Sequence, residues 1–314
     1  MNQTRVIHSL AIIFCLTHRW AAPLFAQDAA PADRHPVNTK TRPGDMMADS
    51  PVVFPAKGAL PSNYPPDVKT ISSPTEKGYY LFSSPCRSLQ QMAAIRADMP
   101  GGEFTRPVNT WTHLQRTRHI LTKGGDLNIL ALGDSIVNDT MRSGWVALLQ
   151  QAYPQATIKA TVYVRGGGGC QHFKEKDRMK THVIGRRPDL VLIGGISQKS
   201  LADIREVIRQ LRQGLPNVEI LLFTGTFGTT DPRHGKALAQ AHHSGTGDYR
   251  NKLNALAQAT HCAYLDMTGP WAQYIVSSQE HPHRFYRDVV HANAQGEQIL
   301  AKILLSFFDS DGNN

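Results

Sequence analysis

Two short groups of residues, far apart in the chain, have the types and spacing for nucleophilic catalysis. Gly133-Asp134-Ser135 follows an apolar run, which puts a hydroxyl at the end of a candidate strand. Asp288 and His291 stand three positions apart near the end of the chain. A histidine can accept the proton of a serine hydroxyl while a carboxylate orients its ring. The two groups predict hydrolysis through an acyl-enzyme, if the fold brings them together.

Each group also has a simpler explanation when it is taken alone. Asp134 or Ser135 can serve only as the cap of a following helix, and most Asp-x-x-His pairs belong to surface turns. The position of the second group favours the catalytic interpretation, because Asp288 and His291 come directly before the last predicted helix. A loop there can return both side chains to the edge of the sheet that holds Ser135.

The elements around Ser135 are predicted from hydrophobic patterns. Residues 128–133 are apolar and short enough for a buried strand. A helix is predicted over 135–152, because Trp145, Leu148 and Ala152 fall on one helical face. A strand that turns into a helix puts its last residues at the carboxyl edge of the sheet, where open α/β sheets keep their sites.

The rest of the chain alternates in the same way. Strands are predicted over 156–164, 189–194, 218–224 and 262–266, and helices over 201–211, over 247–260 and after Asn293. Strands alternating with helices imply an α/β fold with a parallel sheet covered on both sides.

The first 126 residues divide into three segments. Residues 1–26 place Arg5 before an apolar run and end in small residues at Ala26, which predicts a signal peptide and a secreted or periplasmic protein, with an uncleaved anchor as the alternative. Residues 27–76 are rich in proline, alanine, serine and aspartate, which predicts a poorly ordered linker. Residues 77–126 predict a short helical N-terminal extension, and residues 127–309 the catalytic domain.

Charge and composition exclude some classes of function. The chain carries +9, or +7 if it begins after Ala26, which suits acidic polymers or anionic surfaces. Its basic residues are scattered and no zinc-finger or RNA-recognition signature is found, so no nucleic-acid partner is expected. No stretch beyond the signal approaches the ~20 apolar residues of a membrane span.

No cofactor or metal site is expected either. The glycine run Gly166–Gly169 is not followed by Gly-Lys-Ser/Thr, as phosphate binding would require. The histidines outside the Asp288 group show no metal-ligand spacing. Signal removal leaves Cys86, Cys170 and Cys262, which permits one disulfide and one spare thiol, with the pairing open.

Four blocks of the sequence stand in the order found in one known family. They are Gly133-Asp134-Ser135, the glycine turn after the second strand, a glycine-containing turn after the third, and Asp288-x-x-His291. Over about residues 127–308 the chain resembles the SGNH hydrolases, also called the GDSL esterase/lipase superfamily. The resemblance implies a three-layer, flavodoxin-like α/β/α fold with about five parallel strands. It also implies hydrolysis of esters, commonly acetyl esters of polysaccharides, and of lipids and thioesters.

The resemblance assigns roles to individual residues. Ser135 matches the nucleophile, Asp288 the carboxylate and His291 the general base. The second block supplies an oxyanion-hole N–H at Gly169, or at Gly168 if the alignment slips by one residue, beside the N–H of Ser135. In the third block Ser197 stands where the family has asparagine. Either Ser197 donates in its place, or Gln198 reaches in, or the site is weakened, since losing one donor costs about 10²–10³ in rate.

The sequence thus predicts an exported serine esterase acting on acyl esters, O-acetyl groups of a polysaccharide foremost, without metal or cofactor. A lipase or thioesterase would use the same three residues with an apolar acyl groove. A non-catalytic glycan-binding module with a decayed site is the alternative from another class, because Ser197 replaces the expected asparagine.

Overall fold

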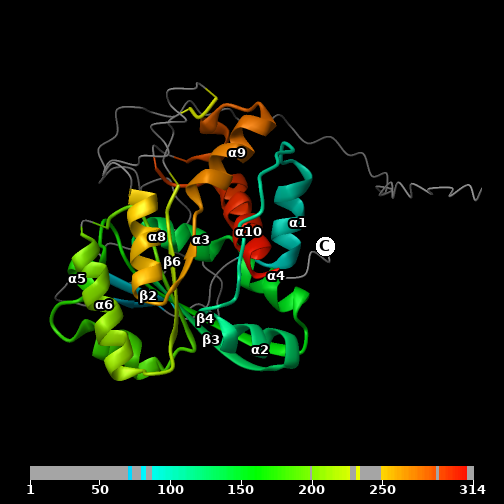
Figure 1. Ribbon diagram of the computed structural model, residues 1–314. Helices are drawn as coiled ribbons and strands as arrows, with labels where there is room; N and C mark the ends of the chain where they lie inside the picture. The colour runs from blue at the N-terminus through cyan, green and yellow to red at the C-terminus, as the bar shows by residue number, and fades with distance from the viewer. Residues whose placement is uncertain are drawn as a thin grey trace, which may run out of the picture. The chain divides into compact units, whose positions relative to one another are not determined.

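The computed structural model describes residues 70–72, 79–82, 87–198, 200–226, 231–233, 249–287 and 290–309, and the statements below concern these residues. They contain a seven-stranded sheet with the order β1-β2-β4-β3-β5-β6-β7. The five strands β4, β3, β5, β6 and β7 pair in parallel, as predicted, and β2 and β1 extend the β4 edge antiparallel. Helices cover both faces, which gives the expected three-layer α/β/α fold (Figure 1).

The strands end together where chemistry was predicted. Gly133 pairs with Val164, and Leu132 pairs with Ile193 on the other side, so the carboxyl ends of three strands meet at one edge. The strand bounds are β1 Thr70–Ser72, β2 Tyr79–Phe82, β3 Gly125–Gly133, β4 Ala156–Arg165, β5 Leu190–Ile193, β6 Glu219–Phe223 and β7 Ala263–Leu265.

The two faces of the sheet carry different helices. The bounds are α1 Leu89–Ala97, α2 Gln115–Lys123, α3 Ser135–Arg142, α4 Trp145–Ala152, α5 Cys170–Phe173, α6 Leu201–Gly214, α8 Tyr249–Ala259, α9 Thr268–Ser278 and α10 Ala294–Phe308. Shorter π and 3-10 turns span Met179–Val183, Ile184–Arg186 and Pro282–Phe285. We call α1, α2, α3, α4, α9 and α10 the α10 layer, and α5, α6 and α8 the α6 layer; Figure 1 shows α6 and α8 apart from α1 and α10.

Strand β3 contributes side chains to both layers, because successive side chains of a strand point to opposite faces of the sheet. Leu127, Ile129 and Ala131 join the apolar cluster of the α10 layer. Leu130 and Leu132 join that of the α6 layer. All five are at most 2% exposed, so β3 is the central, fully buried strand that the apolar run predicts.

The predicted helix over 135–152 is wrong in one respect, because it is two helices. Helix α3 ends at Arg142 and α4 begins at Trp145, with Gly144 between them in the left-handed region at φ 84°. A Cβ on Gly144 would lie 2.5 Å from Met92 Sδ and 2.8 Å from Arg87 O. The bend therefore allows the segment before α1 to pack closely against this turn.

The region before residue 127 contains strands as well as helices. Residues 79–82, inside the predicted helical extension, form β2, and residues 70–72, inside the predicted linker, form β1. The Tyr-Tyr-Leu-Phe sequence of β2 has the composition that strands favour. Residues 1–69, which include the predicted signal peptide and most of the linker, lie outside the described residues, as does Cys86.

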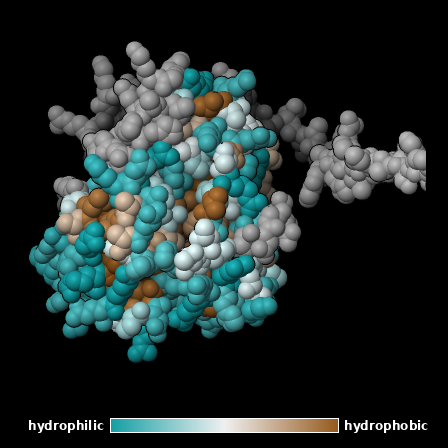
Figure 2. All heavy atoms as spheres, in the orientation of Figure 1, coloured by the Kyte–Doolittle hydropathy of each residue, from teal (hydrophilic) through white to brown (hydrophobic). Residues whose placement is uncertain are grey.

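The surface is that of an ordinary globular protein. Figure 2 shows a face that is largely hydrophilic, with hydrophobic residues in small separate groups. Four large apolar side chains are exposed among the described residues: Leu89, Val108, Ile196 and Val276. No helix in the described ranges is long and apolar enough to cross a membrane.

Candidate active site

The site is built around the contact between Ser135 and His291. Ser135 is the first residue of α3, directly after β3. His291 precedes Asn293, whose side chain caps α10 by accepting from the N–H groups of Gln295 and Gly296. The imidazole Nε2 of His291 lies 2.7 Å from Ser135 Oγ, although 156 positions separate the two residues. His291 is 5% exposed and Ser135 is half-buried, so the imidazole is buried while the serine stays partly accessible.

The third residue of the predicted cluster, Asp288, lies outside the described residues. Its neighbour Arg287 is described, and the N–H of Arg287 donates to the carbonyl of His291 at 3.0 Å. A bridge between Tyr286 and Ala292 closes the same segment.

The turn that presents Ser135 needs a glycine and an aspartate. A Cβ on Gly133 would lie 2.4 Å from Val137 Cγ2 and 2.6 Å from the carbonyl of Gly194, so only glycine fits there. Asp134 is the N-cap of α3 and accepts from the N–H of Ile136 at 2.9 Å. The capping interpretation is therefore correct for Asp134, while the Ser135 hydroxyl faces His291.

Asp134 has a second role, which its position in the sequence does not reveal. Its Oδ2 accepts from the N–H groups of Ile196 and Ser197, each at 2.7 Å, and so holds the loop after β5 against the nucleophile turn. Gly195, at φ 99°, makes room, since a Cβ there would lie 2.3 Å from Asp134 Oδ1. Burial raises the pKa of Asp134, and hydrogen bonds from the Ser197 side chain and from these N–H groups oppose the rise.

The glycine turn after β4 lies against the loop after β5. A Cβ on Gly169 would be 2.7 Å from the carbonyl of Ser197. Gly169 is also the residue before α5. The N–H of the neighbouring Gly168 donates to the carbonyl of Arg165 at 2.9 Å and is thus used within the turn.

Gln198 joins these two loops and does not reach toward Ser135. Its Oε1 accepts from the N–H of Cys170 at 2.9 Å, and its Nε2 donates to the carbonyl of Gly194 at 3.0 Å. The side chain is 7% exposed. Since both ends of the amide are engaged, its role is to fix the start of α5 to the end of β5.

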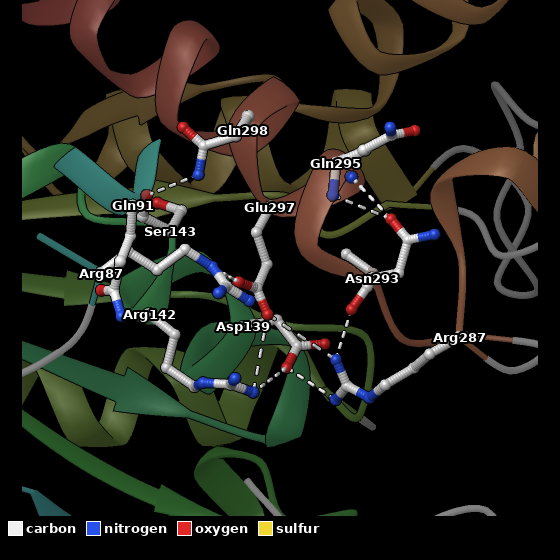
Figure 3. A network of polar contacts seen from close by, with 12 residues as sticks. Arg87, Gln91, Asp139, Arg142, Ser143, Arg287, Asn293, Gln295, Glu297 and Gln298 are labelled. Atoms are coloured by element: carbon white, nitrogen blue, oxygen red, sulfur yellow. Dashed lines mark hydrogen bonds and ion pairs between the residues drawn. The ribbon is translucent and has the colours of Figure 1, made fainter. Parts of the chain in front are cut away.

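A network of buried charges links α3 and α10 through arginine side chains (Figure 3). Asp139, on α3, pairs with Arg287 at 2.8 Å. Glu297, on α10, pairs with Arg87 at 2.6 Å and lies 3.5 Å from Arg142. Both carboxylates are at most 1% exposed. The sequence motifs do not reveal this network; the signal available in the sequence is Glu297, an acid in the first turn of the last helix.

Neither of the two described cysteines supplies its thiol to this site. Cys170 and Cys262 are buried free thiols, and burial raises the pKa of each. A thiol whose pKa is raised is a poor nucleophile near neutral pH, so both act as packing residues.

Taken together, the geometry allows proton transfer from a serine hydroxyl to a histidine at the carboxyl edge of a parallel sheet. Two glycine-containing loops, held by Asp134 and Gln198, lie beside the turn that carries that hydroxyl.

Comparisons with known proteins place this geometry in context. The model of one family, described as the GDSL-like Lipase/Acylhydrolase family, matches residues 131–299. No curated protein matches the sequence.

Among solved structures, a two-domain esterase (CEX) active on acetylated mannans is similar at 14% identity and a TM-score of 0.51. The match covers 68% of this chain, but the chain spans only 56% of that esterase. An acetyl xylan esterase from Geobacillus stearothermophilus is similar at 20% identity and a TM-score of 0.47, over 58% of this chain and 94% of that one.

Proposed function

This chain belongs to the GDSL-like lipase/acylhydrolase family, and we propose from that premise that it is an exported serine esterase that hydrolyses acyl esters. The observation that carries the proposal is the 2.7 Å contact between His291 Nε2 and Ser135 Oγ. At that distance the imidazole can take the hydroxyl proton as the oxygen attacks an ester carbonyl.

The remaining roles follow the family pattern. Asp288 is proposed as the carboxylate that orients His291 and stabilises its protonated form. His291 then returns the proton to the departing alcohol, which leaves an acyl group on Ser135. Water, activated by the same imidazole, releases the acid.

The oxyanion is proposed to bind to the N–H groups of Ser135 and Gly169. The first N–H groups of a helix have no acceptor within the helix, and Ser135 opens α3. Gly169 is preferred to Gly168, because the N–H of Gly168 already donates to Arg165. Ser197 is the third proposed donor. Its side chain bonds Asp134, so its hydroxyl must turn away from that carboxylate to donate to the oxyanion.

The proposed chain organisation is a signal peptide over 1–26, a linker over 27–76, an N-terminal extension over 77–126 and a catalytic domain over 127–309. The proposed substrate is an O-acetyl ester of a polysaccharide. Support comes from the structural similarity to the esterase active on acetylated mannans, and acetylated mannan is the first polymer to test.

The test compares the wild type with Ser135→Ala and His291→Ala on p-nitrophenyl acetate. Loss of the nucleophile or the base should lower kcat by at least about 10³-fold. Ser306→Ala is the matched control, because its hydroxyl donates to the carbonyl of Ile303 on α10, away from the Ser135–His291 contact. A fluorophosphonate probe should label the wild type and the control but not Ser135→Ala.

Equal turnover by the wild type, Ser135→Ala and His291→Ala would reject the proposal. Faster hydrolysis of octanoate than of acetate esters would point to the lipase or thioesterase alternative. Polysaccharide binding with neither turnover nor labelling would identify the glycan-binding module instead.

A further inference from the structure

The Ser135–His291 contact joins two parts of the chain that share no secondary-structure element. Ser135 belongs to α3, whereas His291 lies between the 3-10 turn Pro282–Phe285 and α10. A hydrogen bond at 2.7 Å requires these parts to stay aligned, since displacements of about 1 Å can cost about 10²-fold in rate. Some contact must therefore fix α3 relative to the histidine segment.

Arg287 holds the histidine segment through two bonds. Its main-chain N–H donates to the carbonyl of His291 at 3.0 Å. Its guanidinium Nη1 donates to the carbonyl of Ala292. The carbonyls of His291, the proposed base, and of the next residue, Ala292, are thus both bound by Arg287.

The same guanidinium also binds α3, the helix that begins with the proposed nucleophile Ser135. Its Nη2 donates to Asp139 Oδ1 at 2.8 Å. Asp139 lies four residues after Ser135 in α3, which is about one helical turn. Ser135, Asp139, Arg287 and His291 therefore form a closed ring: one helical turn, one ion pair, one main-chain bond and the 2.7 Å contact (Figure 3 shows the Asp139–Arg287 part).

Burial makes this ion pair more directional than a surface pair. The Asp139 side chain is 1% exposed and that of Arg287 16%. The other cation near Asp139 is Arg142, whose Nη1 is 3.9 Å away. A buried ion pair contributes little net stability compared with apolar packing, but removing one partner is costly, which restricts the pair to one arrangement.

We propose that Arg287 is a positioning residue, which sets the distance between His291 and Ser135. Its guanidinium binds Asp139 and the carbonyl of residue 292, and its main-chain N–H binds the carbonyl of residue 291. The proposal rests on the proposed esterase function. It assigns Arg287 no contact with substrate.

The chain offers a matched control in the same network. The Arg87 side chain pairs with Glu297 at 2.6 Å and, within the described residues, contacts neither Asp139 nor the segment 290–293. Arg87→Gln and Arg287→Gln each remove one cation from the network. Only the second variant breaks the ring through Ser135 and His291.

The experiment measures kcat and KM on p-nitrophenyl acetate, the fluorophosphonate labelling rate and the Tm of the full chain. For Arg287→Gln we expect kcat and the labelling rate to fall about 10²-fold, with KM within about twofold, because substrate contacts are kept. Arg287→Lys keeps the charge but loses the forked geometry and should recover about a tenth of the wild-type kcat. Arg87→Gln should lower Tm and leave kcat within about twofold of wild type.

Asp139→Asn provides a second route if Arg287→Gln does not fold. It should reproduce the loss in kcat, and the double variant with Arg287→Gln should be no worse than either single variant, because both break the same bond. A kcat for Arg287→Gln, or for Asp139→Asn, equal to that of Arg87→Gln at a temperature where all are folded would overturn the positioning role. A wild type without turnover or labelling would instead reject the esterase function itself.

Discussion

The two helical layers on the sheet are held by different forces. The α6 layer packs through an apolar cluster that includes Ile204, Val207 and Leu211 of α6. Apart from tyrosines, the titratable side chains in this cluster are the thiols of Cys170 and Cys262. The α10 layer has a larger apolar cluster and, next to it, the buried charges of Asp139, Arg142 and Glu297.

The difference coincides with the position of the candidate site. Apolar burial, which dominates the α6 layer, stabilises without direction. Buried ion pairs add little net stability but strongly restrict geometry. The charges occur where Ser135 of α3 must meet His291 before α10, which is the place where direction matters most.

The largest test of this comparison removes the central charge of the network. Glu297→Gln keeps the size of the side chain but removes the carboxylate that pairs with Arg87, and it leaves Asp139 as the buried carboxylate beside Arg142 and Arg287. We expect a loss of about 3 kcal/mol in the free energy of unfolding, at the lower end for a broken buried pair because Arg87 and Arg287 are partly exposed. Urea denaturation measures it.

A matched variant on the α6 layer provides the control. Glu206→Gln breaks the exposed pair with Arg209 on the surface of α6, and solvent screening should leave the urea midpoint unchanged. If both glutamate variants gave the same midpoint, burial of the α10-layer charges would have no energetic consequence and the comparison would fail.

The second test removes apolar volume from the α6 layer. Val207 is fully buried, and Val207→Ala should lower the free energy of unfolding by about 2 kcal/mol through lost burial and a small cavity. Because His291 contacts Ser135 of the α10 layer and Val207 lies in the apolar cluster on the other face of the sheet, kcat on p-nitrophenyl acetate should stay at the wild-type value while the protein is folded.

Arg205→Ala, at an exposed position of the same helix, should change neither the free energy of unfolding nor kcat. A lower kcat for Val207→Ala would show that the α6 layer also positions Ser135 and His291. The assignment of this role to the α10 layer alone would then be wrong.

Local patterns explain why much of the fold was predictable. The apolar run before Gly133 fixes a buried strand, and the turn into α3 follows from contacts within a few residues, such as Asp134 with Ile136. Asn293 as the cap of α10 is equally local. These features depend on neighbours in the sequence, which a periodic pattern displays.

Features that depend on distant neighbours were missed. Gly144 breaks the predicted 135–152 helix because Met92 and Arg87 lie against it. Helix α9 was not predicted, since its first turn contains Gly269 and Pro270 and its start is buried on all sides, which hides the periodicity of an amphipathic helix.

The candidate site likewise contains both local motifs and contacts between residues far apart in the sequence. The Ser135 block and the Asp288-x-x-His291 block are visible as short motifs. The Asp139–Arg287 ion pair spans 148 positions, and no spacing rule connects such residues. The anchoring of Ser197 by Asp134 is likewise a contact between loops, across 63 positions, that only the sheet order explains.

The smallest test uses the thiols that distinguish the α6 layer. Burial raises the pKa of Cys170 above its ordinary value, with the charge of Asp203 adding to the rise. The folded chain therefore keeps this proton at pH values where the unfolded chain releases it. The stability that this thiol contributes is complete below the ordinary pKa of a thiol and is lost as pH rises above it.

Between pH 8 and pH 10 the wild type should therefore lose about 1.4 kcal/mol more free energy of unfolding than Cys170→Ala. Cys262→Ala should give a smaller difference, because Arg212 favours the thiolate of Cys262 and opposes the burial effect. Parallel pH profiles for the wild type and Cys170→Ala would mean that the thiol is not sealed inside the α6 layer.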